Sequence, residues 1–403
     1  MKRASVPGAL HLIAPFHTVP SLEFSHCAFT MKALRFPKMM KGFFQGGVIE
    51  YGNEGSESLA DEHVKILTKS EVRKLYPRDP ADFIGNHAKV GSEGHRLFEE
   101  RLRRAMRKRV RLHDFVAHPF GCAHASIIPE FAAAMHVETG IGYPDAPIEG
   151  PTQAGTTARI YESHAWMYRH LGRWEGTSYG LGTNPCYSFV IPNYFDPEEW
   201  PYGKGEGDAK GPYILFMGRI NSSKGADIVG TLLKAWFQKY PKSALRFVFA
   251  GQGDFEWIRA HCGEYAGKAE YVGALVGKDR SKWMRNAVAS IMPTQFIEPF
   301  GGSGVEGLLS GTPLLASDWG AFTETIEPGL NGYRFRTLGD MIRSVELVLE
   351  GRLNREDIAA AAREKYSLAA CRKKYERVFT LLHELKSGEG AMSTRGDTLD
   401  EGS

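Results

Sequence analysis

A regular alternation of short apolar runs with helical segments in the C-terminal half constrains the fold of this chain most. Residues 213–217 form a continuous apolar run that ends at Gly218, as expected for a strand covered on both faces of a parallel sheet. A helix is expected at 226–240, and further strands are expected at 245–250, 270–272, 288–293 and 313–317. This pattern is typical of a doubly wound parallel sheet, which binds ligands at the carboxyl ends of its strands.

The N-terminal half repeats the alternation less clearly, and a length of 403 residues favours two domains. Its expected strands lie at 11–14, 47–51, 63–67, 114–118, 134–138 and 189–191. We predict an N-terminal domain at 1–195 and a C-terminal domain at 210–367, joined by a Pro-, Gly- and acid-rich linker at 196–208. A helix at about 368–386 should pack back on the first domain, and the Gly/Ser-rich tail at 387–403 should be disordered.

Composition narrows the class of protein but names no partner. Hydrophobic residues make up 42% and charged residues 24%, a globular balance, and a formal net charge of +3 implies no partner by itself. The five cysteines are scattered without a Cys-x-x-Cys pair, which favours a reducing compartment and no structural zinc. No apolar run approaches the roughly 18–20 residues that cross a bilayer. Prolines interrupt the apolar start, so we expect a first strand there and a cytoplasmic protein, peripheral at most to a membrane.

The segment from Glu298 to Glu306 carries the chemistry expected at such a strand end. Its run Gly301-Gly-Ser-Gly304 opens an expected helix, and a glycine-rich helix start lets phosphates approach free backbone N–H groups. Glu306, early in that helix, can accept hydrogen bonds from the vicinal hydroxyls of a ribose. Glu298 precedes the helix and can bind hydroxyls of a second ring. One short segment therefore predicts contacts with phosphate, ribose and sugar.

Two cations are expected at the same edge of the sheet. Arg219 follows the first strand of this half, and Lys224 starts the next helix. A lone Arg or Lys at a helix start is usually a solvated side chain. Both of these residues, however, flank a strand end that faces the glycine-rich segment. We therefore expect them to stabilise a departing diphosphate.

These motifs resemble, in their order, the donor domain of the retaining glycosyltransferases of family four, which have the GT-B fold. The resemblance covers roughly residues 188–350 and rests on several ordered elements. They are Val190-Ile-Pro-Asn193, Gly218-Arg219, Lys224-Gly225, Glu298-Pro-Phe-Gly301, Glu306, Gly311-Thr-Pro313, Ala316-Ser-Asp318 and Asn331-Gly332. The resemblance implies an α/β protein whose two Rossmann-like, doubly wound domains face each other across a cleft.

The resemblance also implies an activity and residue roles. A sugar would move from a nucleotide-sugar, with a UDP-sugar favoured, to an acceptor hydroxyl with retention of the anomeric configuration. Arg219, Lys224 and Glu298 would be catalytic. The donor-binding set would comprise Arg219, Lys224, Val272, Glu298, Phe300, Gly301, Gly302, Ser303 and Glu306. No cofactor or metal is expected, because there is no Asp-x-Asp motif and the two cations can neutralise the leaving group.

The acceptor side is less well specified. Asp114-Phe-Val-Ala-His118 resembles the segment that carries the family's histidine beside the donor sugar, so His118 is the expected catalytic histidine, although a core histidine would fit equally well. His17, His26 and Glu138 are weaker candidates for acceptor binding. The family's glycine pair after the first strand is missing, and Trp319-Gly-Ala-Phe322 replaces a second glycine pair. The first departure leaves contacts from the loop of His17 and His26 open.

Two basic segments bear on the partner. Arg96 to Arg111 contains eight basic and two acidic residues at helical spacing, which is either a solvated helix face or a surface for DNA or a membrane. Lys32, Arg35, Lys38 and Lys41 form a second stripe on a helix whose apolar side should face the core.

Three functions follow from these observations. The leading hypothesis is transfer of the sugar to a carbohydrate or lipid-linked acceptor. The first alternative is transfer to a hydroxylated base in DNA, as in some viral enzymes of this fold. The second alternative is a non-catalytic protein that binds a sugar-nucleotide or a nucleic acid. The four intact donor-side residues argue against the second alternative.

Overall fold

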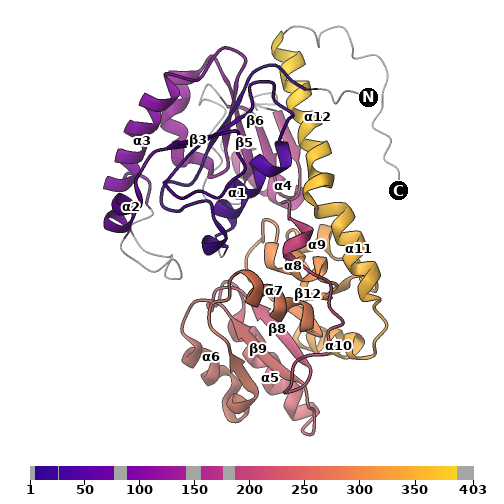
Figure 1. The fold of residues 1–403 in the computed structure, drawn as a ribbon. Helices are drawn as coiled ribbons and strands as arrows, with labels where there is room; N and C mark the ends of the chain where they lie inside the picture. Colours follow the sequence, from indigo (N-terminus) through magenta and orange to yellow (C-terminus); the bar gives the residue numbers. More distant parts are fainter. Residues whose placement is uncertain (1–4, 26, 77–88, 142–155, 176–186, 388–403) are drawn as a thin grey trace, which may run out of the picture.

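The computed structural model describes residues 5–25, 27–76, 89–141, 156–175 and 187–387. Two α/β domains, each built on a fully parallel sheet, lie one above the other, and a long C-terminal helix connects them along one side (Figure 1). The expected doubly wound architecture of both halves is confirmed. His26 and residues 388–403 of the tail expected at 387–403 lie outside the described residues, whereas Ser387 is the last residue of a helix.

Seven strands form the N-terminal sheet in the order β3-β2-β1-β4-β5-β6-β7. They are β1 (Leu10–Ile13), β2 (Val48–Gly52), β3 (Glu62–Lys65), β4 (Phe115–His118), β5 (Met135–Ile141), β6 (Thr156–Tyr161) and β7 (Tyr187–Val190). The four-residue strands β1 and β4, at the centre, are buried along their whole length. Since β1 and β4 end side by side, the loops that follow them meet at one edge of the sheet.

Six strands form the C-terminal sheet in the order β10-β9-β8-β11-β12-β13. They are β8 (Tyr213–Met217), β9 (Arg246–Ala250), β10 (Ala269–Tyr271), β11 (Ala289–Met292), β12 (Leu314–Ser317) and β13 (Gly332–Phe335). Alternate residues of β8 enter different cores: Ile214 and Phe216 pack on one face, and Leu215 and Met217 pack on the other. Burial of both faces explains why this strand is a continuous apolar run.

Helices cover the sheets and fill the connections between their strands. The N-terminal domain contains α1 (Ala28–Met40), α2 (Lys69–Leu75), α3 (Glu93–Met106), α4 (His164–Glu175) and the 3-10 helices η1 (Leu22–Phe24) and η3 (Gly121–Phe131). The C-terminal domain contains α5 (Ala226–Lys239), α6 (Phe255–Cys262), η5 (Gly263–Lys268), α7 (Gly277–Asn286), α8 (Gly302–Leu309), α9 (Phe322–Thr325), α10 (Leu338–Leu349) and α11 (Arg355–Tyr366).

The last helix, α12 (Leu368–Ser387), belongs to the core of the first domain, although it follows the second domain in sequence. The ring of Phe379 lies 5.0 Å from that of Phe115 and 5.1 Å from that of Phe44. The ring of Tyr375 lies 5.1 Å from that of Phe36 on α1. These contacts bury one face of α12 against the N-terminal sheet, where each large side chain contributes about 1.5–3 kcal/mol.

The chain crosses between the domains twice, at one place. The backbone N–H of Phe195 donates to the carbonyl of Tyr366, and the N–H of Leu368 donates to the carbonyl of Phe195, both at 2.9 Å. After the first crossing, the expected linker forms η4 (Pro197–Glu199) and then follows the C-terminal domain, where Gly203 N–H donates to the carbonyl of Ser310. The linker is therefore anchored to the second domain.

Direct contacts beside this crossing also join the domains. The Ser163 hydroxyl donates to the carbonyl of Pro299 at 2.7 Å. The Glu324 carboxylate accepts from the backbone N–H groups of His164 and Ala165, at the start of α4, at 3.0 and 2.7 Å. A carboxylate at a helix N-terminus is electrostatically favourable. Together with the double crossing, these contacts fix the loop after Glu298 against the first domain.

Candidate active site

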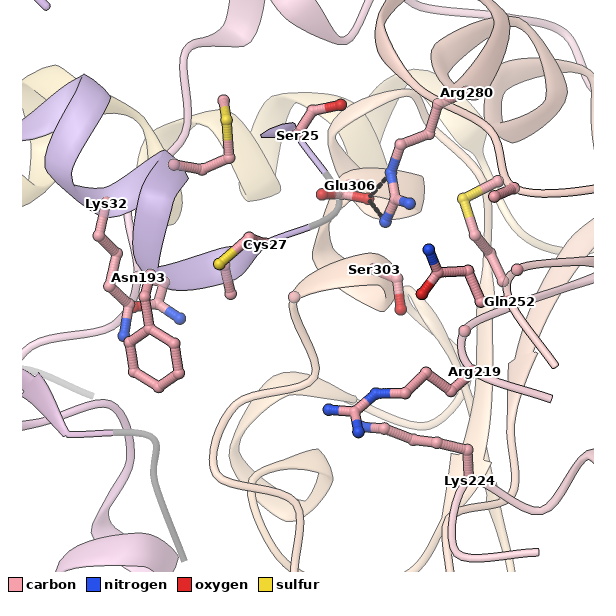
Figure 2. Close-up of a pocket in the computed structure, with 18 of the residues that line it drawn as sticks. Ser25, Cys27, Lys32, Asn193, Arg219, Lys224, Gln252, Arg280, Ser303 and Glu306 are labelled. Atoms are coloured by element: carbon pink, nitrogen blue, oxygen red, sulfur yellow. Dashed lines mark hydrogen bonds and ion pairs between the residues drawn. The ribbon is translucent and has the colours of Figure 1, made fainter. Parts of the chain in front are cut away.

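A cavity of about 890 Å³ lies between the two domains, at the carboxyl ends of the central strands. Its N-terminal wall comes from α1 and the loop before it, and its C-terminal wall comes from the loops after β8, β9 and β11 and from α7 and α8. Figure 2 shows Ser25, Cys27 and Lys32 on one side and Arg219, Lys224 and Ser303 on the other. Both domains therefore contribute side chains to one cavity.

The start of α8 presents backbone to this cavity. Gly301, at the N-cap, has φ +79°, and a Cβ there would lie 2.6 Å from the Phe322 ring, so only glycine fits. Gly302 and Ser303 follow and line the cavity. The first N–H groups of an α-helix lack intrahelical partners, and the helix dipole favours an anion beside them. The residues predicted to contact phosphate are therefore at a helix start that faces the cavity.

Arg219 and Lys224 lie next to each other on the same wall (Figure 2). Lys224 precedes Gly225, which has φ +75° and packs so closely on the end of β11 that a Cβ would lie 2.0 Å from the Pro293 carbonyl oxygen. The Lys224 ammonium donates to Oε2 of Glu298 at 2.8 Å. Two ion pairs lie on this wall, Lys224–Glu298 and Arg280–Glu306. Among the described residues, Arg219 belongs to neither pair.

Glu298 is held by its backbone as well as by Lys224. The carbonyl of Glu298 accepts from the N–H of Ala321, and Gly320, with φ +61°, packs against its backbone. The indole N–H of Trp319 donates to the carbonyl of Phe296 at 3.1 Å. The Trp319–Phe322 segment, which departs from the family's sequence, therefore supports the loop of Glu298.

Glu306 extends from α8 into the cavity and is 8% exposed. Arg280 of α7 donates to Oε2 of Glu306 through both Nε, at 2.8 Å, and Nη2, at 2.5 Å. Burial raises the pKa of Glu306, and the Arg280 guanidinium opposes that rise. The carboxylate predicted to bind a ribose is thus buried, paired and directed at the cavity.

The remaining predicted donor residues lie at the edge of this wall. Phe300 is buried, and its ring stacks 6.2 Å from that of Phe195 at the domain crossing. Val272 packs against the C-terminal core, with its N–H donating to the carbonyl of Phe249. Neither of these residues lines the cavity, and Gly301 does not line it either, so the structure does not bring these three predicted donor residues to its surface.

The predicted acceptor-side residues are less well assembled. His118 is 2% exposed and does not line the cavity; its Nε2 lies 2.9 Å from Nδ1 of His136. Burial and His136 hold the pKa of His118 well below 6.5, so the ring is neutral. His17 does line the cavity, and burial lowers its pKa to about 3. The structure thus brings His17, and not His118, to the cavity surface.

Glu138 has a structural partner. The register of β5 and β6 places it opposite Arg159, and the two fully buried side chains form an ion pair at 2.9 Å. Glu138 does not line the cavity. This pair also explains why β6 is absent from the sequence prediction, because a buried arginine makes the strand look polar.

Several residues that line the cavity belong to none of the motifs that predicted the site. Lys32 and Arg35 of the second basic stripe are 5% and 7% exposed and line the cavity, paired with Glu162 and Glu199. The apolar side of α1 packs in the core as expected, through residues such as Phe36. The charged side of α1 lines the cavity through Lys32 and Arg35 and does not face solvent alone. Arg280 lies in a strongly charged stretch that looks like an exposed helix face, so only its partner in space reveals it.

The basic segment from Arg96 to Arg111 is largely paired with acids. Arg101 binds Glu71 at 2.7 Å, and Arg103 and Arg107 share Glu130. Exposed pairs of this kind contribute little to stability, but they offset much of the local positive charge. The arrangement favours a solvated helix face over a surface for nucleic acid.

One group of metal-type ligands occurs among the described residues, namely His95, Glu99 and His124. Both nitrogens of His95 are already used: Nδ1 accepts from the N–H of Gly91 at 3.0 Å, and Nε2 donates to the carbonyl of Ala123 at 2.7 Å. That ring has no lone pair left for an ion, so the group does not fit a metal site.

Within the described ranges, no helix is long and apolar enough to span a membrane.

Comparison with known proteins matches the C-terminal domain to one family. Residues 211–350 match the family described as Glycosyl transferases group 1. The chain is 26% identical over 270 residues to glycogen synthase of Mycobacterium tuberculosis, a stretch covering 64% of this chain and 63% of that protein. It is 30% identical over 125 residues to phosphatidyl-myo-inositol mannosyltransferase of the same organism, covering 31% of this chain and 32% of that protein. The chain thus spans less than two thirds of each of these relatives.

Solved structures match nearly the whole chain. AviGT4, a glycosyltransferase involved in avilamycin A biosynthesis, has a TM-score of 0.62 at 18% identity, over 94% of this chain and 98% of its own. HepE of Anabaena, solved in complex with UDP and glucose, has a TM-score of 0.60 at 13% identity, over 92% of this chain and 99% of its own. The expected GT-B fold, with two Rossmann-like domains, is confirmed.

Proposed function

We infer that the chain is a glycosyltransferase, which the comparisons support, and we propose that it moves a sugar from a nucleotide-sugar to an acceptor hydroxyl. One observation carries the proposal. A single cavity brings together the cations Arg219 and Lys224, the N-terminus of α8, and the carboxylates Glu298 and Glu306. Cations and a helix start fit a diphosphate, and two carboxylates fit the hydroxyls of a ribose and a sugar.

The charges of the cavity suggest how the leaving group would be stabilised. Arg219 is available for an anion, whereas Lys224 is shared with Glu298 at 2.8 Å. As the bond from sugar to diphosphate breaks, negative charge grows on the diphosphate, and both side chains can donate charge-assisted hydrogen bonds to it. We propose that this pair replaces a divalent metal and that the reaction needs no cofactor.

We propose retention of the anomeric configuration, through transfer on the face of the departing diphosphate. Support comes from the order of motifs along the sequence, which resembles the retaining family four. Glu298, bound to Lys224 and to the loop of Ala321, is placed to hold sugar hydroxyls rather than to attack as a nucleophile. Closing of the two domains on the donor would exclude water and limit hydrolysis.

For the donor we favour a UDP-sugar, since HepE, of similar fold, was solved with UDP and glucose. For the acceptor we favour a carbohydrate or lipid-linked hydroxyl, bound against the N-terminal wall with His17 and with His118 behind it. Transfer to a DNA base is not favoured, because the basic face of α3 is largely paired with acids. A purely binding role is not favoured either, because Arg219, Lys224, Glu298 and Glu306 all line the cavity.

The first test is a thermal-shift screen with UDP-, GDP- and ADP-sugars, followed by measurement of nucleotide release. A matched donor should raise the melting temperature with its concentration. Arg219→Ala should weaken donor binding about 10- to 100-fold, since hydrogen bonds to charged groups contribute about 1.5–3 kcal/mol.

Arg343→Ala, which removes an exposed arginine of α10 paired with Glu346, is the control and should bind the donor normally. The proposal fails if no nucleotide-sugar stabilises the wild-type protein, or if both variants bind the donor equally well.

A further inference from the structure

The contact between Arg280 and Glu306 is the feature of the cavity that the donor roles above leave unexplained. Arg280 extends from the middle of α7, and its guanidinium reaches across to the carboxylate on α8 (Figure 2). The two side chains are 15% and 11% exposed, so the pair is largely removed from water. A buried ion pair seldom stabilises a fold more than apolar packing would, so stability alone does not explain this pair.

The geometry of this pair is asymmetric. Both nitrogens of Arg280 donate to the same oxygen, Oε2, at 2.8 and 2.5 Å. Within the described part of the chain, no hydrogen bond to Oε1 is found. An ionised carboxylate offers about four acceptor positions, two on each oxygen. Arg280 therefore occupies the positions on Oε2 and leaves both positions on Oε1 for other donors.

We propose that Arg280 is a positioning residue for the nucleotide: it fixes the Glu306 carboxylate so that Oε1 alone receives the two ribose hydroxyls. This inference rests on the proposed function. A vicinal diol supplies two O–H donors, which matches the two acceptor positions that remain. Without the guanidinium, the carboxylate would be free to rotate, and the penalty for burying its charge would no longer be offset.

The surroundings of Glu306 leave Arg280 as its direct ionic partner. Arg35 of α1 and Glu199 of η4 also act on it electrostatically, with opposite signs, and they are paired with each other. Strands β11 and β12 carry no charged residue, and α11 packs on α8 through Ile358, Ala359 and Ala362. Loss of Arg280 should therefore raise the pKa of Glu306 further, because burial already raises it.

The experiment compares binding of a nucleoside diphosphate with that of its 2′-deoxy form, by calorimetry at pH 6, 7 and 8. The probe is whichever of UDP, GDP and ADP stabilises the wild-type protein most. The wild-type protein should bind the ribonucleotide at least about tenfold more tightly than the deoxynucleotide at each pH. Arg280→Gln should reduce the preference to within about twofold at pH 6 and less strongly at pH 8, because loss of the guanidinium raises the pKa of Glu306 further. Arg280→Lys, which keeps one donor and the charge, should lie between.

The ratio of the two affinities and two control variants separate this role from a structural one. A merely structural loss would weaken both nucleotides equally and leave their ratio unchanged. Arg285→Gln, on the same helix but outside the cavity lining, should keep the wild-type ratio. Adding Arg280→Gln to Glu306→Gln should change the ratio no further, since both act through one carboxylate.

The outcomes also distinguish this inference from the proposed function. If the wild-type protein binds none of the three nucleotides, the proposed function fails and the inference fails with it. If it binds a nucleotide, and Arg280→Gln and Arg280→Lys keep the full preference for ribose or bind more tightly than wild type, only the role of Arg280 is overturned. The same holds if the wild-type protein shows no preference for the ribonucleotide.

Discussion

The ion pair between Lys224 and Glu298 joins the cation that we propose for the donor phosphate to the carboxylate that we propose for the donor sugar. Nζ of Lys224 and Oε2 of Glu298 are 2.8 Å apart, and Glu298 is 7% exposed. The pair neutralises both groups, so neither buried charge is left alone. When a nucleotide-sugar enters, its diphosphate and hydroxyls would satisfy each partner separately. The pair thus keeps the site ready to bind both halves of the donor.

The Lys224–Glu298 pair predicts different effects of Glu298→Gln on turnover and on UDP binding. The amide keeps the shape of the side chain but loses the charge that attracts Lys224 and the sugar hydroxyls. Turnover should fall about 100-fold, as when other transition-state contacts are removed. Affinity for UDP alone should be unchanged or higher, because Lys224 is released toward phosphate. Steady-state kinetics and calorimetry measure the two effects.

Glu346→Gln, which removes a carboxylate paired with Lys239 outside the cavity lining, serves as the control and should change neither quantity. A parallel loss of UDP affinity and turnover in Glu298→Gln would show instead that Glu298 supports the fold of the site.

For single residues, the sequence could predict a shared role only where the residues lie close together along the chain. Glu298, the glycines and Glu306 lie within nine residues, so their chemistry could be interpreted together. Arg280 is 26 residues from Glu306, and Lys32 is 130 residues from Glu162. Neither pairing follows a helical or strand spacing. Only the fold brings such residues together, so their burial and their position in the cavity could not be predicted.

Among the elements, α12 contributes most to a domain that it does not follow in sequence. Phe379 is fully buried between Phe44 and Phe115, and Leu381 on the same helix is 39% exposed. Phe379→Ala should lower the free energy of unfolding by about 3–5 kcal/mol through lost burial and a cavity. Leu381→Ala should cost far less. Urea denaturation of the two variants would measure the difference, and equal losses would contradict the packing described.

The elements that the sequence analysis missed share a physical cause. Strand β6 contains Arg159, whose charge is satisfied by Glu138 on the neighbouring strand and therefore tolerated inside the sheet. Strand β13 is a four-residue edge strand, bonded on one side only. Both lack the apolar run that identified β8. A strand such as β8 is visible in sequence because both of its faces are buried and apolar.

For the whole molecule, buried histidines make stability depend on pH. Burial lowers the pKa of His17 to about 3 and that of His136 to about 4, and it holds that of His118 well below 6.5. Below about pH 6.5 the unfolded chain binds protons at these residues and the folded protein does not, so stability falls with acidification. Each residue can contribute up to about 1.4 kcal/mol per pH unit.

Urea midpoints measured from pH 7 down to pH 5 should therefore decrease steadily. His136→Gln should flatten the curve, whereas His164→Gln, with a side chain 59% exposed, should not. A midpoint that stays constant between pH 7 and pH 5 would contradict this account.

The two halves of the molecule differed in how far their function could be predicted. The residues proposed to bind the donor lie in short, glycine-rich motifs, which the sequence displays directly. The N-terminal wall, where we propose that the acceptor binds, is built from α1, the loop before it and η3, and its charged residues are paired with distant partners. Its glycine pair is replaced by Ala14-Pro-Phe-His-Thr18, so no short motif marks it.

The return of α12 to the first domain has a consequence for synthesis on the ribosome. Residues 371–382 complete the core around Phe36 and Phe115, yet they are translated after the whole second domain. At roughly 5–20 residues per second, about 190 residues separate the first crossing from the end of that core, a delay on the order of 10–40 s. During this interval the nascent N-terminal sheet has an uncovered apolar face. That face stays exposed on the nascent chain until α12 is synthesised.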